Sequence, residues 1–65
     1  MSYENETVDL TLTILHETPS AVFVSDGDNE CWLAKSQINI LDDYEVGDDV
    51  EIVVPEWMAL ANDLI

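Results

Sequence analysis

Fifteen acidic residues stand against a single lysine in this chain of 65 residues, so the formal net charge at pH 7 is −14. Like charges at this density repel one another and oppose any compact state. The chain can therefore fold only if its carboxylates stay in water. Apolar residues make up 48% of the sequence, which is ordinary for a globular protein and too high for a disordered acidic tail. We expect a small folded domain with an acidic surface.

The length is enough for one domain, which we place at residues 1–65 with a loose polar segment over 1–6. The single cysteine, Cys31, has no internal disulfide partner, which favours a reducing compartment. No apolar run approaches the roughly 18 residues of a membrane span, and no signal peptide opens the chain. We expect a cytoplasmic monomer without membrane association.

The first half of the chain has the pattern of three strands. Polar and apolar residues alternate from Thr7, and this period of two predicts a half-buried strand that ends near Pro19. Residues 21–24 and 31–34 flank a turn in which Gly27 is free to adopt a positive φ, which predicts a hairpin. The apolar face of the first strand comprises Val8, Leu10, Leu12 and Ile14.

The second half predicts two more strands and a helix. A short strand over 38–40 precedes an acidic loop hinged at Gly47, and a buried strand follows over 50–54. Pro55 suits the first position of a helix of about ten residues, which is too short to be stable alone and must pack on the sheet. The expected apolar stripe of this helix is Trp57, Leu60, Ala61 and Leu64.

Together these elements predict the α+β class. The expected architecture is a small antiparallel sheet of three to five strands with one C-terminal helix packed on it.

The side chains available for catalysis are few. The chain has one histidine, His16, one cysteine, one lysine and no arginine, and no oxyanion donor or orienting residue accompanies them. We expect no enzymatic activity, no catalytic residue and no cofactor. We interpret Cys31 as an inert core residue, because it lies in an apolar strand. Four aromatic residues could form a stacking platform but, without basic neighbours, are interpreted as core and edge packing: Phe23, Trp32, Tyr44 and Trp57.

The turn between the second and third strands has the D-x-D-x-E spacing that opens a calcium-binding EF-hand loop. The rest of that pattern is missing, since Cys31 stands where glycine is needed and Gln37 where a bidentate glutamate is needed. We therefore expect no metal site and interpret the turn as a solvated hairpin tip.

The acids gather in clusters along the chain. A folded chain of this mass exposes roughly 4,200 Å², so an even spread gives about one charge per 300 Å². Duplex DNA, as a cylinder of roughly 10 Å radius, carries about one charge per 100 Å². Only acids concentrated on about a third of the surface would match DNA. We name as partner-binding candidates a first arm, Asp42, Asp43, Glu45, Asp48, Asp49 and Glu51, and a second arm, Asp26, Asp28 and Glu30.

Two stretches, CWLAKSQI at 31–38 and VPEWMA at 54–59, resemble a group of very small phage and mobile-element proteins. With its size and acidity, the whole chain further resembles the phage-encoded anti-CRISPR proteins, in particular an acidic inhibitor of type I-C systems. This resemblance implies binding to the Cascade surveillance complex and exclusion of its target DNA by mimicry. No functional residue carries over from a family motif.

Our leading hypothesis is a non-enzymatic inhibitor whose acidic face occupies the basic DNA-binding surface of a protein complex, a CRISPR Cascade subunit first of all. Such a protein needs no contact with nucleic acid itself, for which the chain lacks clustered Lys and Arg. Two alternatives stay open: an acidic structural or assembly subunit bound to one basic partner, and a small domain from a high-salt cytoplasm.

Overall fold

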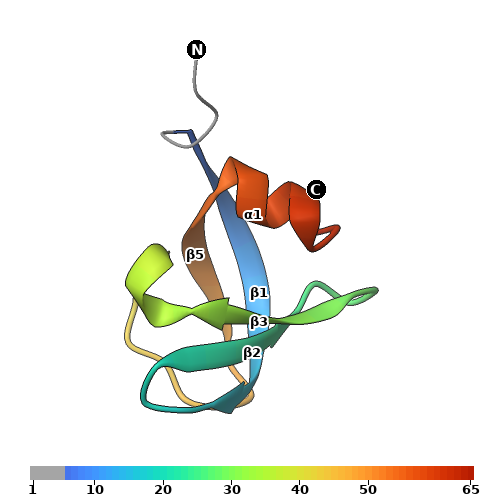
Figure 1. Ribbon diagram of the computed structural model, residues 1–65. Helices are drawn as coiled ribbons and strands as arrows, with labels where there is room; N and C mark the ends of the chain where they lie inside the picture. The colour runs from blue at the N-terminus through green and yellow to red at the C-terminus, as the bar shows by residue number, and fades with distance from the viewer. Residues whose placement is uncertain (1–5) are drawn as a thin grey trace.

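The computed structural model describes residues 6–65, which form one antiparallel sheet of five strands and one short helix (Figure 1). The expected α+β architecture is confirmed at this level. The predicted loose segment over 1–6 falls, except for Glu6, outside the described residues. The elements in chain order are β1 (Thr7–Glu17), β2 (Ala21–Ser25), β3 (Glu30–Ala34), a 3-10 helix (Lys35–Gln37), β4 (Asn39–Ile40), β5 (Asp49–Pro55) and α1 (Glu56–Ala61).

The strand order is β3-β2-β1-β5-β4, with the long strand β1 at the centre. The first part of β1 pairs with β5, from Thr7 opposite Pro55 to Thr13 opposite Asp49. Its last part pairs with β2, and a bulge between Ile14 and His16 interrupts the register there. A bulge bends its strand and increases the local twist. The β2–β3 hairpin consequently lies across β1 and β5 (Figure 1).

The core lies between the inner face of the sheet and α1. The alternation predicted for β1 is confirmed, because Leu12 and Ile14 are buried while Thr11 is exposed. None of the polar or charged side chains in residues 6–65 is buried, so the carboxylates meet the requirement that they stay in water. The buried core comprises Leu12, Ile14, Val22, Val24, Leu33, Val50, Ile52, Val54, Met58, Ala59 and Leu64.

The helix differs from the expected one in length and in the face that it buries. It has six residues, and Met58 and Ala59 face the core. Trp57 and Leu60 are 43% and 53% exposed, and Ala61 is exposed as well, so the predicted stripe was wrong for these three residues.

The cause lies at the end of α1, where the chain turns back at Asp63 in a left-handed conformation, with φ of 57°. The Asp63 N–H donates to the Leu60 carbonyl at 3.2 Å, and the Leu64 N–H donates to the Ala59 carbonyl at 2.8 Å. These two bonds define a Schellman motif, and it directs Leu64 into the core beside Ala59. No helix within the described part of the chain is long and apolar enough to cross a membrane.

Candidate functional site

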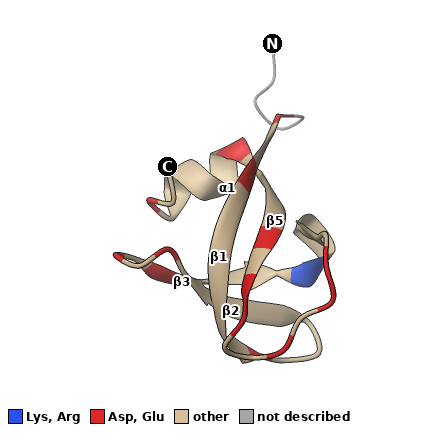
Figure 2. Ribbon diagram, turned by 180° about the vertical axis from the view of Figure 1, so that it is seen from behind, with Lys and Arg blue, Asp and Glu red and all other residues tan. Residues whose placement is uncertain are grey.

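The outer face of the β1–β5 ladder carries a regular line of acids, which we call the acidic stripe: Asp9, Glu51 and Asp49. Asp9 lies opposite Val53, Glu51 opposite Thr11, and Asp49 opposite Thr13, so the three acids occupy three successive outward levels of the ladder. All three are exposed. Alternate residues of a strand are about 6.8 Å apart, and diagonal neighbours across a ladder about 7–8 Å. The stripe is therefore a line of acidic positions at nearly even intervals. Figure 2 shows acidic segments on the neighbouring strands β1 and β5.

Both ends of the acidic stripe continue into further acids. At one end the Ile14 N–H donates to the Asp48 carbonyl at 2.9 Å, and the Asp48 carboxylate accepts the Glu45 N–H at 2.9 Å. These bonds hold the loop that contains Glu45 and Asp48 against the end of the ladder. At the other end the Glu56 N–H donates to the Glu6 carbonyl at 2.9 Å, which brings these two acids together.

The second predicted arm lies in the hairpin that joins β2 and β3. One carboxylate oxygen of Asp26 accepts the N–H groups of Asp28 at 2.8 Å and Asn29 at 2.7 Å. These backbone donors, that of Asn29 first, lower the pKa of Asp26 below its usual value. The Asn29 side chain also donates to the Asp63 carbonyl at 2.9 Å, so the turn is tied to the C-terminal end of the chain.

One cross-strand row connects the two arms. Asp49 pairs with Thr13, Thr13 with Ser25, and Ser25 with Glu30, so the row crosses four strands of the sheet. The Thr13 hydroxyl donates to the Asp49 carboxylate within this row. At about 4.8 Å between neighbouring strands, Asp49 and Glu30 lie about 14 Å apart along the sheet. The structure thus places one acid of each arm on the same outer face.

Asp42 and Asp43 lie elsewhere, in the loop that follows β4. This loop and the hairpin turn extend on opposite sides of the sheet (Figure 2). Both acids are exposed, but neither belongs to the β1–β5 ladder. The first predicted arm is therefore split: Asp49 and Glu51 lie in the ladder, Glu45 and Asp48 lie in the loop at its end, and Asp42 and Asp43 lie apart from it.

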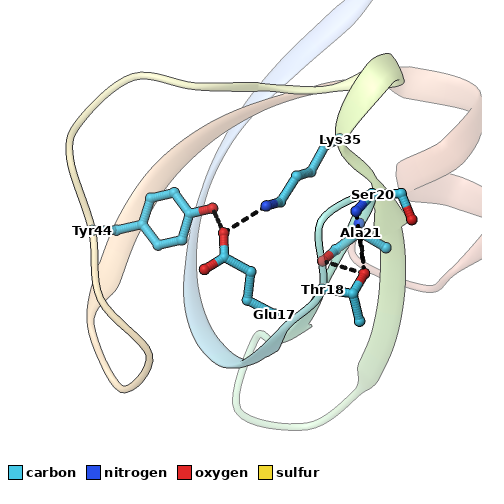
Figure 3. Close-up of polar contacts among 6 residues, drawn as sticks. All are labelled: Glu17, Thr18, Ser20, Ala21, Lys35 and Tyr44. Atoms are coloured by element: carbon cyan, nitrogen blue, oxygen red, sulfur yellow. Dashed lines mark hydrogen bonds and ion pairs between the residues drawn. The ribbon is translucent and has the colours of Figure 1, made fainter.

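A cluster of three side chains fixes that loop to the sheet (Figure 3). Glu17 accepts a hydrogen bond from the Lys35 ammonium at 2.6 Å and another from the Tyr44 hydroxyl. The Lys35 bond, and after it the Tyr44 bond, lowers the pKa of Glu17, while the bond to Glu17 raises the pKa values of Lys35 and Tyr44. Tyr44 also packs against the core. The only lysine of the chain is thus already paired with a carboxylate.

Residues 10–54, which include most of the sheet and both loops described above, match the S1 domain family. The chain belongs to the S1 domain family. No curated protein and no solved structure matches it. Membership points to an OB-like fold of a nucleic-acid-binding class, in which the face of the second and third strands binds oligonucleotides. The match gives no support to the anti-CRISPR resemblance, which stays a prediction.

The S1 domain contains functional candidates that the sequence did not single out. Asp9 is not among the partner-binding candidates named from the sequence, and only its pairing opposite Val53 places it in line with Glu51. The alternation of β1 already put Asp9 on the outer face, but which strand lies beside β1 is set by the fold. The interpretation of Phe23 and Trp32 as packing likewise left out their alignment with His16 in a row of aromatic side chains.

The remaining chemistry of the S1 domain is limited. Among residues 6–65, no three His, Cys, Asp or Glu side chains come together as metal ligands. Cys31 is half-buried, and burial, with Asp26 as a lesser cause, raises the pKa of its thiol. A thiol with a raised pKa is a poor nucleophile, because the thiolate is the reactive form.

Proposed function

We propose that this S1 domain is a non-enzymatic inhibitor that imitates DNA and occupies a basic DNA-binding channel. The target that the sequence resemblance implies is the Cascade complex of a type I CRISPR system. Each exposed carboxylate would take the place of a phosphate and pair with a lysine or arginine of the channel.

The observation that carries this proposal is the spacing of the three acidic positions along the acidic stripe. A DNA strand that winds at roughly 10 Å radius, with about 10 nucleotides per 34 Å turn, places successive phosphates about 7 Å apart. The ladder spaces Asp9, Glu51 and Asp49 at about 7–8 Å and 6.8 Å. A row of cations arranged for one phosphate strand would therefore meet a carboxylate at each position.

The charge balance supports a decoy over a nucleic-acid binder. A protein that holds DNA neutralises phosphates with lysine and arginine, and this chain has a single lysine, paired with Glu17. A face with dense negative charge is instead attracted to a basic groove, which accelerates the encounter. Once bound, it excludes DNA from that groove by mass action.

Direct binding of single-stranded nucleic acid is the second candidate. The family match and the two aromatic residues Phe23 and Trp32 on β2 and β3 favour it, because these are the strands that an OB-like fold uses for its ligand. The net charge of −14 opposes it. Fluorescence polarisation of a labelled oligonucleotide tests it: micromolar binding at 0.15 M salt would favour this candidate over the decoy.

The decisive experiment measures competition for a purified type I-C Cascade complex. We expect the protein to bind this complex and to displace labelled target DNA from it. The variant Asp9→Asn/Glu51→Gln removes two charges of the acidic stripe with little change in shape. We expect it to inhibit at least tenfold less well, since each charge-assisted contact is worth about 1.5–3 kcal/mol.

The matched control adds two positive charges on a different part of the surface. The variant Ser36→Lys/Gln37→Lys changes exposed residues of the 3-10 helix and has the same net charge of −12. We expect this control to inhibit almost as well as the wild type, with both variants folded by circular dichroism. Equal inhibition by the stripe variant and the wild type would contradict the proposal, as would full binding of DNA in the presence of saturating protein.

A further inference from the structure

Three aromatic rings form a row on the outer face of the β1–β2–β3 part of the sheet, which we call the aromatic row: His16, Phe23 and Trp32. His16 pairs with Phe23 in the strand register, and Phe23 pairs with Trp32. The ring centroids of His16 and Phe23 are 6.0 Å apart with nearly parallel planes, and those of Phe23 and Trp32 are 5.0 Å apart. Phe23 therefore packs against both neighbouring rings, and these contacts restrict the orientation of the three side chains.

The aromatic row is open to solvent at its β3 end. Trp32 is 52% exposed although it is the largest side chain of the row, and β3 is an edge strand of the sheet. The interpretation of Trp32 as packing thus accounts for only part of its surface. A large exposed aromatic side chain that packs against a second ring is typical of protein interaction sites.

The surroundings of the aromatic row are acidic. Glu30 lies two residues before Trp32 on β3, and therefore on the same face of the sheet, and it is exposed. Asp26 and Asp28 lie in the turn that precedes β3. The electron-rich face of an aromatic ring attracts cations, and these carboxylates attract the same charge. The chain has one lysine, Lys35, and no arginine, and Lys35 is paired with Glu17.

We propose that the aromatic row binds arginine side chains of a basic protein partner, with a guanidinium stacked on Trp32 and hydrogen-bonded to Glu30. This inference rests on the proposed function and names the chemistry by which the partner is recognised. Arginine fits better than lysine because its planar guanidinium stacks on a ring and donates two parallel hydrogen bonds to a carboxylate. A nucleic-acid base would stack equally well, but its phosphates would be repelled by Glu30 and the turn acids. A second copy of the chain would bring another 14 negative charges.

The first test uses two peptides of equal charge, an acetylated and amidated hexa-arginine and the corresponding hexalysine. Each is added to the isotopically labelled full-length chain, and the indole N–H signals of Trp32 and Trp57 are followed by NMR. Trp57 is the internal control, because it is 43% exposed but lies on α1, outside the aromatic row. We expect hexa-arginine to shift the Trp32 signal more than the Trp57 signal, and hexalysine to shift both weakly. Equal shifts of the two indoles would overturn the proposal, as would a larger Trp32 shift with an oligothymidylate.

The second test uses variants. We expect Trp32→Ala to weaken hexa-arginine binding about two- to fivefold, the range of an exposed cation–π contact, and the matched control Trp57→Ala to leave it unchanged. Trp32→Phe retains a ring and should recover part of the loss, which keeps the test decisive if Trp32→Ala folds poorly. Identical affinities of the Trp32 and Trp57 variants would overturn the proposal.

The two proposals fail in different ways. If Trp32→Ala excludes DNA from Cascade as well as the wild type while Asp9→Asn/Glu51→Gln does not, the aromatic site is refuted and the decoy stands. If the stripe variant inhibits like the wild type, the decoy is refuted, whatever the peptides show.

Discussion

At the scale of single residues, Asp63 has the least favourable backbone position that the structure describes. Among residues 6–65 it is the one residue other than glycine with a positive φ, at 57°. Its carboxylate also lies at the C-terminal end of α1, where the helix dipole disfavours negative charge. We expect Asp63→Gly to remove both penalties and raise the free energy of unfolding by about 1 kcal/mol, as measured by urea denaturation.

The variant Asp63→Asn separates the two contributions to this effect. Asparagine tolerates the left-handed conformation and has no charge, so it should recover only the electrostatic part. An Asp63→Gly protein no more stable than the wild type would show that the turn into Leu64 is not strained.

Glu17 makes the stability of the fold depend on pH at both ends of the scale. Its hydrogen bonds to Lys35 and Tyr44 lower its pKa in the folded protein below the ordinary value of 4.5. The stabilisation is therefore present above about pH 4.5 and is lost as the pH falls through the folded pKa. The pKa of Lys35 is raised above 10.5, so its contribution is present below that pH and is lost as the pH rises further.

The comparison of wild type with Glu17→Gln measures this dependence. We expect the urea midpoint of the wild type to exceed that of Glu17→Gln at pH 7 and the difference to shrink at pH 3 and again above pH 11. The effect is small, because all three groups lie at the solvent-exposed surface. A difference in urea midpoint that does not change with pH would show that Glu17→Gln loses stability through side-chain packing and not through charge.

At the scale of elements, the strands of this domain could be predicted and the end of the helix could not. A period of two is a local property, so residues 7–14 and the hairpin around Gly27 were confirmed. The C-terminal stripe assumed a straight helix as far as Leu64, but the turn at Asp63 ends α1 at Ala61. The local pattern fits both a straight helix that buries Leu64 and a shorter helix after which the chain turns back and buries Leu64.

The site depends on pairings between strands, which local patterns do not contain. The acidic stripe needs β1 beside β5, although 31 residues of chain separate Glu17 from Asp49 in the sequence. The aromatic row needs His16 opposite Phe23, and the bulge after Ile14 sets that register. Charge clustering along the chain therefore named Asp49, Glu51 and Glu30 as candidates but not Asp9. The interpretation of Trp32 as packing did not anticipate its exposure.

At the scale of the whole molecule, salt should have opposite effects on folding and on binding. The structure exposes 4168 Å² of surface with 14 net negative charges, and their repulsion weakens as salt screens it. If screening contributes about 1 kcal/mol, the unfolding temperature rises by about 4–8 °C between 10 mM and 500 mM NaCl. Binding to a basic channel should weaken over the same range, because the same ions screen the attraction.

The salt dependence of the unfolding temperature and of binding also distinguishes the proposed decoy from a domain adapted to a high-salt cytoplasm. A decoy should already show a cooperative thermal transition at 10 mM NaCl, whereas a domain adapted to a high-salt cytoplasm should be unfolded there. The variant Asp9→Asn/Glu51→Gln, with a net charge of −12, should show a smaller rise in unfolding temperature with salt than the wild type. Affinity for Cascade that stays constant from 50 mM to 500 mM NaCl would contradict recognition by charge. Carboxylates that replace phosphates make the same charge contacts, so their binding should weaken with salt as DNA binding does.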